Sequence, residues 1–177
     1  MQVPWRHIAL AAVGVLASGC SGLFESKPPG PCPGVSVPRD AAHVVQFLPG
    51  PGRDLIDVRY QGSIEPLSAR CRYIDDDKTV EMRLSVGISA RKGPAAEAGT
   101  ADFAFFVAIT DLNQTILAKQ VFQSPIEFPT GRRRAGSIEE IEQLIPLPEG
   151  TNGASYEIVI GFQLEKDQLD YNRLRRR

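Results

Sequence analysis

One unbroken alternation of apolar and polar residues constrains the fold of this 177-residue chain more than any other feature. In TVEMRLSVGISARK, which spans Thr79–Lys92, every second residue from Val80 to Ala90 is apolar, and the residues between them are polar or glycine. A period of two is that of a β-strand, not of a helix. We therefore expect this strand to place one face on a hydrophobic core and the other in water.

Other segments also have the composition of strands, and Gly, Pro, Asn and Asp separate them. FAFFVAIT, from Phe103, is apolar on both faces, which is typical of a central strand. The remaining predicted strands are Val35–Val37, His43–Leu48, Leu55–Ile64, Thr115–Phe122 and Tyr156–Leu164, with the turn Asp111–Gln114 making a hairpin. Short strands with little helical signal predict an all-β fold, an antiparallel immunoglobulin-like β-sandwich.

Two segments carry helical signals. Ser137–Glu140 has the form of a capping box, and the apolar residues of 138–145 fall at helical spacing. Because Pro146 ends this segment and its clear neighbours are strands, we favour a strand for residues 137–146, with a helix as the alternative. The tail Glu165–Arg177 is expected to form a short helix.

The first twenty residues have the three parts of an export signal. Arg6 precedes the apolar run Ile8–Leu16, which is too short for a transmembrane helix, and small residues then lead to Cys20. This arrangement resembles the lipobox of bacterial lipoproteins. We expect residues 1–19 to be a signal peptide and Cys20 to carry diacylglycerol and an amide-linked fatty acid such as palmitate. The alternative is an ordinary secretory leader that leaves Cys20 as a thiol.

The other two cysteines, Cys32 and Cys71, form an even pair in the oxidising compartment that export implies. We expect a disulfide between them, with two buried free thiols as the alternative. Residues 20–34 are rich in Pro and Gly and are predicted to be a tether, followed by a single domain at 35–177. Ser21, where an inner-membrane retention signal has Asp, favours the outer membrane.

Candidate chemistry is sparse. After removal of the leader the only histidine is His43, on a predicted strand, so we expect no enzyme, no metal site and no cofactor. Asp75–Asp77 lack the spacing of a calcium loop and are expected in a solvated turn. Two carboxylates suited to glycoside hydrolysis could still meet from distant parts of the chain. A net charge of −1 argues against nucleic acid as a partner.

Arginines gather in two places. The clusters are Arg132, Arg133 and Arg134, and then Arg173, Arg175, Arg176 and Arg177. One interpretation is a basic contact surface for anionic lipid headgroups or an acidic partner. The other is a solvated turn and a loose tail.

Several stretches resemble one family of small uncharacterised lipoproteins of alphaproteobacteria. They are FLPGPGRDLIDVRYQGSI, ARCRY, FFVAITD, ILAKQVF, EEIEQLIPLP and YEIVIGFQL followed by YNR. The resemblance implies that Cys20 is the anchor and that Cys32 and Cys71 are the family's paired cysteines. It implies no activity.

Three hypotheses for function follow. The first is a non-enzymatic interaction or assembly module of the periplasm, anchored by lipid to the outer membrane, that binds an envelope protein through edge strands and loops. The second is a carrier for an apolar small molecule or lipid between the sheets, lined by Phe103, Phe105, Phe106 and Phe162. The third, a hydrolase, is the weakest because histidine is so scarce.

Overall fold

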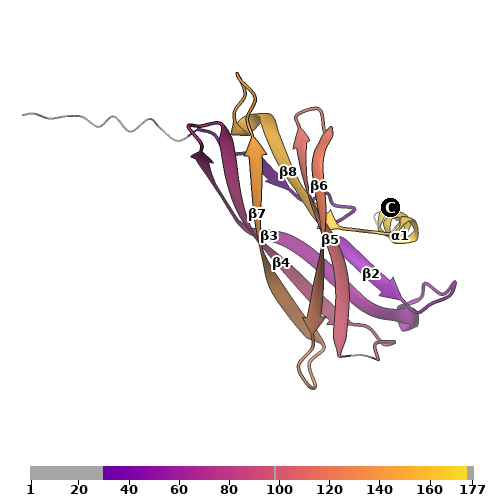
Figure 1. Cartoon of the computed structure of the whole chain (residues 1–177). Helices are drawn as coiled ribbons and strands as arrows, with labels where there is room; N and C mark the ends of the chain where they lie inside the picture. The colour runs from indigo at the N-terminus through magenta and orange to yellow at the C-terminus, as the bar shows by residue number, and fades with distance from the viewer. Residues whose placement is uncertain (1–29, 98, 175–177) are drawn as a thin grey trace, which may run out of the picture.

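Two four-stranded β-sheets pack face to face in the computed structural model, which describes residues 30–97 and 99–174 (Figure 1). The first sheet has the order β1 (Gly34–Ser36), β8 (Tyr156–Phe162), β5 (Thr100–Asp111) and β6 (Ile116–Glu127). The second has the order β2 (His43–Phe47), β3 (Val58–Ile74), β4 (Thr79–Lys92) and β7 (Arg134–Pro146). The predicted all-β sandwich is confirmed at this level.

Every strand pair is antiparallel except one. β1 runs parallel to β8, with Val35 opposite Ile158, so the expectation of a wholly antiparallel sandwich is wrong at this edge. A parallel pair needs a crossover between its strands. Here the elements between them supply it, because β1 is the first and β8 the last strand of the part of the chain that the structure describes.

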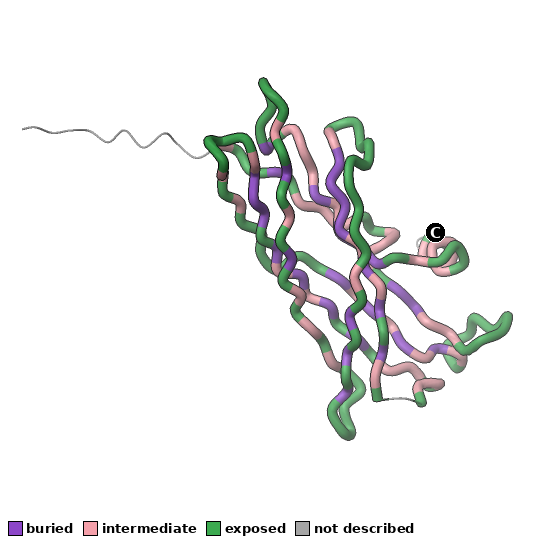
Figure 2. The backbone as a smooth tube through the Cα atoms, viewed as in Figure 1, coloured by how far each residue is buried: buried purple, intermediate pink, exposed green. Residues whose placement is uncertain are grey.

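The predicted alternation in β4 is confirmed, and the apolar face of β4 forms one side of the core (Figure 2). Its inward side chains are at most 3% exposed: Val80, Met82, Leu84, Val86, Ile88 and Ala90. The facing sheet contributes buried residues of β5 and β8: Phe103, Phe105, Val107, Ile158, Ile160 and Phe162. β5 lies between β8 and β6, as its apolar composition on both faces predicts.

Residues 137–146 form a strand, as we favoured. β7 pairs with β4 over its whole length, from Arg134 opposite Arg91 to Pro146 opposite Thr79. Ile141 and Ile145 point into the core, whereas Ile138 and Leu144 are 64% and 53% exposed. The helical spacing of these four residues does not place them on one face, because backbone pairing with β4 imposes a period of two.

Two strands extend at least five residues beyond their predicted C-terminal ends. β3 starts after a 3-10 turn at Leu55–Asp57 and continues to Ile74, ten residues past the predicted end at Ile64. The register shifts between Pro66 and Ser68, and such a bulge accommodates a proline inside a strand. β6 likewise continues past Phe122 to Glu127.

The C-terminal helix α1 (Lys166–Leu174) lies beside β2, which is the edge strand of the second sheet (Figure 1). Tyr171 meets Phe47 edge to face at 5.1 Å, and the Asn172 side chain donates to the backbone carbonyl of His43 at 2.7 Å. The predicted tail helix is confirmed for these residues; Arg175–Arg177 lie outside the described residues. α1 therefore covers one free edge of the sandwich.

Candidate functional site

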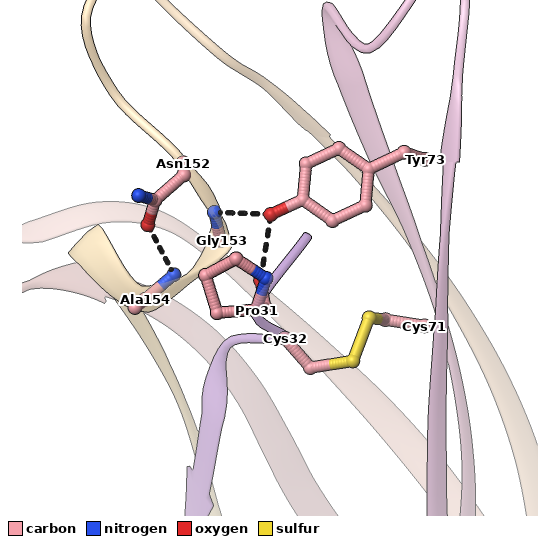
Figure 3. Close-up of a disulfide and its surroundings, with 7 residues drawn as sticks. All are labelled: Pro31, Cys32, Cys71, Tyr73, Asn152, Gly153 and Ala154. Atoms are coloured by element: carbon pink, nitrogen blue, oxygen red, sulfur yellow. Dashed lines mark hydrogen bonds between the residues drawn. A yellow bond between two sulfur atoms is a disulfide. The ribbon is translucent and has the colours of Figure 1, made fainter. Parts of the chain in front are cut away.

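A disulfide and a tyrosine hold residues 30–34 to one end of the sandwich (Figure 3). We call residues 30–34 the N-terminal segment. Cys32 and Cys71 are bonded across 39 positions of sequence with their Cα atoms 5.8 Å apart, which confirms the predicted pair. The Tyr73 hydroxyl donates to the Pro31 carbonyl at 2.6 Å and accepts from the Gly153 amide at 2.8 Å. One phenol oxygen thus joins three segments.

These contacts involve the last residues of the predicted tether, residues 20–34. Residues 30–34, at its end, are docked against β3, and a Cβ on Gly30 would lie 2.5 Å from the Tyr73 ring. Folded contacts therefore begin before residue 35. Cys20 and the predicted signal peptide lie outside the described residues.

The first half of β6 is an exposed strand surface with an apolar composition. Residues 116–121 are exposed on both faces, and Ile116, Leu117 and Val121 are 61%, 53% and 47% exposed. β5 borders β6 on one side, and no described strand borders it on the other. We call Ile116–Val121 the β6 edge.

The turn before the β6 edge is fixed by an aspartate. Asp111 Oδ1 accepts from the backbone amides of Asn113 at 2.9 Å and Thr115 at 2.8 Å. The bond from the Thr115 amide is the main reason that the pKa of Asp111 is lowered. Gln114 completes the turn with a φ of +65°. This local chemistry sets where β6 starts.

β7 is the other edge strand of the second sheet and lies next to β6, but it carries charged side chains. Glu140 and Glu142 are exposed, and Glu139 on the inward side accepts from the Ser124 hydroxyl at 2.7 Å. Charged residues on an edge, including inward-pointing ones, discourage pairing with another strand. The β6 edge has one charge, Lys119, and its ammonium lies over the Phe106 ring at 4.6 Å. Of these two edges, β6 is the one open to a partner strand.

The four described arginines of the two predicted clusters lie on different elements. Arg132 and Arg133 lie in the β6–β7 connection and Arg134 begins β7. Arg173 lies on α1 and pairs with Asp40 at 3.2 Å. Arg175, Arg176 and Arg177 lie outside the described residues.

Arg91 was not among the residues predicted from the sequence, and the register places it directly opposite Arg134. Both line a hollow of about 400 Å³ on the outer face of the second sheet. The polar side chains that share it are His43, Gln61, Ser63 and Ser89. We call this the arginine hollow. The alternation in β4 places Arg91 on the solvent face, but only the register with β7 shows its neighbour.

Farther along the same face, an ion-pair cluster surrounds a buried carboxylate. Glu81 accepts from Arg72 at 2.7 Å and pairs with Arg83 at 2.8 Å, and its side chain is 8% exposed. The hydrogen bond from Arg72 is the main cause that lowers the pKa of Glu81. The same bond raises the pKa of Arg72. The alternation in β4 predicts Glu81 on the solvent face, and its burial could not be predicted from that pattern.

The residues weighed for catalysis and metal binding are separate in space. His43 is exposed on β2, and Asp75–Asp77 form the β3–β4 turn with φ between 54° and 65°. Within residues 30–97 and 99–174, no group of three or more His, Cys, Asp or Glu side chains is arranged to hold a metal ion. None of the helices in this same part of the chain is long and apolar enough to cross a membrane.

The four phenylalanines of the carrier hypothesis do not surround one common space. Phe103, Phe105 and Phe162 are at most 1% exposed in the core between the sheets. Phe106 is half-buried on the opposite face of β5, under Lys119.

The fold and these contacts define a disulfide-linked β-sandwich with an open strand edge at β6 and a cationic hollow on the second sheet. Comparison of the chain with protein-family models, with curated proteins and with solved structures finds no match.

Proposed function

We propose that this protein is a non-enzymatic interaction module of the cell envelope that recruits a protein partner by strand addition to the β6 edge. In this proposal it is an immunoglobulin-like sandwich held to the outer membrane by lipid at Cys20 and facing the periplasm. The observation that carries the proposal is the exposure of Ile116–Val121 on both faces of an edge strand that is paired, among the described strands, on one side only.

The backbone of β6 offers donors to such a partner. Phe128 donates to the Gly99 carbonyl at 2.7 Å, which fixes the alternation of the β5–β6 ladder. By that alternation the amides of Lys119, Val121 and Gln123 point away from β5. The nitrogen of Pro125 also points away from β5, so the proline removes no hydrogen bond between β5 and β6. An added strand gains main-chain hydrogen bonds here, while Leu117 and Val121 offer apolar side-chain contacts.

The docked N-terminal segment supports the anchoring part of the proposal. Gly30 is ten residues from Cys20, and a chain of that length spans at most about 35 Å. The sandwich would therefore stay close to the membrane surface. The disulfide in an exported domain and the family resemblance support the same compartment.

Photocrosslinking in intact envelopes tests the strand-addition proposal. A crosslinkable residue at Leu117 should capture one reproducible protein, whereas the same residue at the exposed Leu144 of β7 should not. Lys119→Pro should abolish the crosslink because it removes an outward amide, and Lys119→Ala should retain it because the amide stays. Equal capture with Lys119→Pro and Lys119→Ala, or no capture at Leu117, would exclude strand addition here.

Mass spectrometry of the native protein tests the anchor. A mature N-terminus at Cys20 carrying diacylglycerol and a fatty acid is expected. An intact leader or an unmodified Cys20 would overturn the anchoring part and leave the β6 proposal to its own test.

A further inference from the structure

The outer face of the β2–β3–β4–β7 sheet holds two like charges in direct opposition. Arg91 on β4 and Arg134 on β7 are partners in the register. The neighbouring Lys92 amide donates to the Arg133 carbonyl at 2.9 Å, so Arg91 and Arg134 form a non-hydrogen-bonded pair, in which side chains approach most closely. Like charges directly opposite each other on a sheet destabilise it.

The described chain supplies no counter-charge to this pair. None of the ion pairs within residues 30–97 and 99–174 includes Arg91 or Arg134. Glu65, the carboxylate next along this face on β3, is opposite Gly87. Gly87 is four residues from Arg91 along β4, or about 13 Å.

A second arginine pair in the same sheet shows what a neutralised pair looks like. Arg70 and Arg83 are also directly opposite, on β3 and β4. There Arg83 contacts two carboxylates, Glu81 at 2.8 Å and Glu142 at 3.4 Å. The sheet thus surrounds one like-charged pair with its own anions and leaves the other facing an open hollow.

The rest of the arginine hollow is rich in hydrogen-bond donors. Ser63 and Ser89 are opposite each other with their hydroxyl oxygens 2.7 Å apart. Two hydroxyls carry two protons and their mutual bond uses one, so one donor stays available. Gln61 adds an amide next to Arg91 and His43 adds an imidazole next to Ser63. None of the residues lining the hollow is Asp or Glu.

From this arrangement we infer that the arginine hollow binds a phosphate-class oxyanion between Arg91 and Arg134. Two guanidinium groups can each present paired N–H donors to one phosphate, and the bound charge offsets their mutual repulsion. The hydroxyls of Ser63 and Ser89 and the amide of Gln61 supply the neutral donors. The site shares no residue with the β6 edge, so this inference does not depend on the strand-addition proposal.

The phosphate can belong to a soluble molecule or to a lipid headgroup. Met82 is opposite Cys71, and Arg91 is nine residues farther along β4, about 30 Å from the disulfide. The hollow therefore lies toward the end of the sandwich opposite the docked N-terminal segment.

The test uses the full-length native protein with inorganic phosphate as the first probe. Saturable shifts of the amide resonances of Ser89, Arg91 and Arg134 are expected on phosphate titration. Arg91→Gln and Arg134→Gln should each weaken binding at least about tenfold, because each removes one charge-assisted contact. Arg70→Gln is the matched control, since it removes an arginine from the other pair and should leave the affinity unchanged.

A second readout guards against misfolded variants. Phosphate should raise the melting temperature of the native protein and of Arg70→Gln, but not that of Arg134→Gln. Without phosphate, Arg134→Gln should melt no lower than the native protein because it relieves repulsion.

Vesicles distinguish the two sources. Binding of the hollow to phosphatidylglycerol vesicles, read as shifts of the Ser89, Arg91 and Arg134 resonances, supports the site with a headgroup as the source. Phosphatidylcholine vesicles should cause no such shifts even where the lipid anchor inserts into them, and Arg91→Gln should abolish the shifts. Phosphate binding without vesicle binding supports it with a soluble source. Failure to bind either probe saturably, or equal weakening by Arg70→Gln, would overturn the inference.

Discussion

The Tyr73 hydroxyl donates to the carbonyl oxygen of Pro31 at 2.6 Å, across 42 positions of sequence. The same oxygen accepts from the backbone amide of the buried Gly153. Together with the Cys32–Cys71 disulfide, these bonds make the N-terminal segment part of the folded body. The orientation of the sandwich relative to an anchor at Cys20 would depend on them.

Tyr73→Phe should lower the free energy of unfolding by about 1–3 kcal/mol. It leaves the Pro31 carbonyl and the Gly153 amide without their partner, and a buried unsatisfied amide carries the larger cost. Thermal unfolding followed by circular dichroism should show a decrease of several degrees with an unchanged folded spectrum. An unchanged melting temperature would mean that water replaces the hydroxyl at both sites.

Replacing both cysteines, Cys32→Ser with Cys71→Ser, should lower the free energy of unfolding by about 4 kcal/mol in the chain-entropy account of a loop this long. Urea titration measures this loss, and the double variant should no longer respond to reductant. A native protein whose urea midpoint is also insensitive to reductant would contradict the disulfide's role.

Glu81 should make stability depend on pH in the acidic range. Its pKa is lowered in the folded protein, chiefly by Arg72, from an ordinary value of 4.5. The folded state therefore binds the proton less readily than the unfolded state. The resulting stabilisation is complete above pH 4.5 and is lost as the pH falls through the lowered pKa.

Urea unfolding from pH 7 to pH 3 measures this contribution. The stability difference between the native protein and Glu81→Gln should shrink as the pH falls below 4.5. Glu149→Gln, at an exposed position in the β7–β8 connection, is the control and should show no such trend. A difference that stays constant with pH would mean that Glu81 acts only through packing.

Gln114→Gly should stabilise the β5–β6 hairpin. Gln114 has a φ of +65°, which costs a residue with a side chain about 1–2 kcal/mol but costs glycine nothing sterically. Glycine's greater freedom in the unfolded chain offsets about 0.5–1 kcal/mol of that gain. The unfolding free energy should therefore rise by up to about 1.5 kcal/mol in urea titration. Asn113→Gly, at a neighbour outside the left-handed region, should lower it.

The strands with regular alternation could be predicted almost to the residue. β4 has the same bounds as its pattern, Thr79–Lys92, and β8 starts at the predicted Tyr156. The long extension of β3 could not be predicted, because Pro66 argues against a strand until β4 is seen to pair beyond it. For residues 137–146 the local pattern allowed both a helix and a strand, and pairing with β4 decided the outcome.

The candidate sites, like the strands, could be predicted from the sequence only in part. The cysteine count and the expectation of export predicted the disulfide, whereas Arg132–Arg134 allowed either a basic contact surface or a solvated turn. Neither indicated Tyr73 as a bridge, the burial of Glu81 or the pairing of Arg91 with Arg134. These three features depend on contacts between residues far apart in the sequence, which a local sequence pattern does not predict.

By itself, the sequence determined that this chain is made of strands, because a period of two depends only on neighbouring residues. Tertiary structure alone decided which edge stays open and which charges meet. Strand order and register are set by the packing of the whole core, and a shift of one residue would move every side chain to the other face.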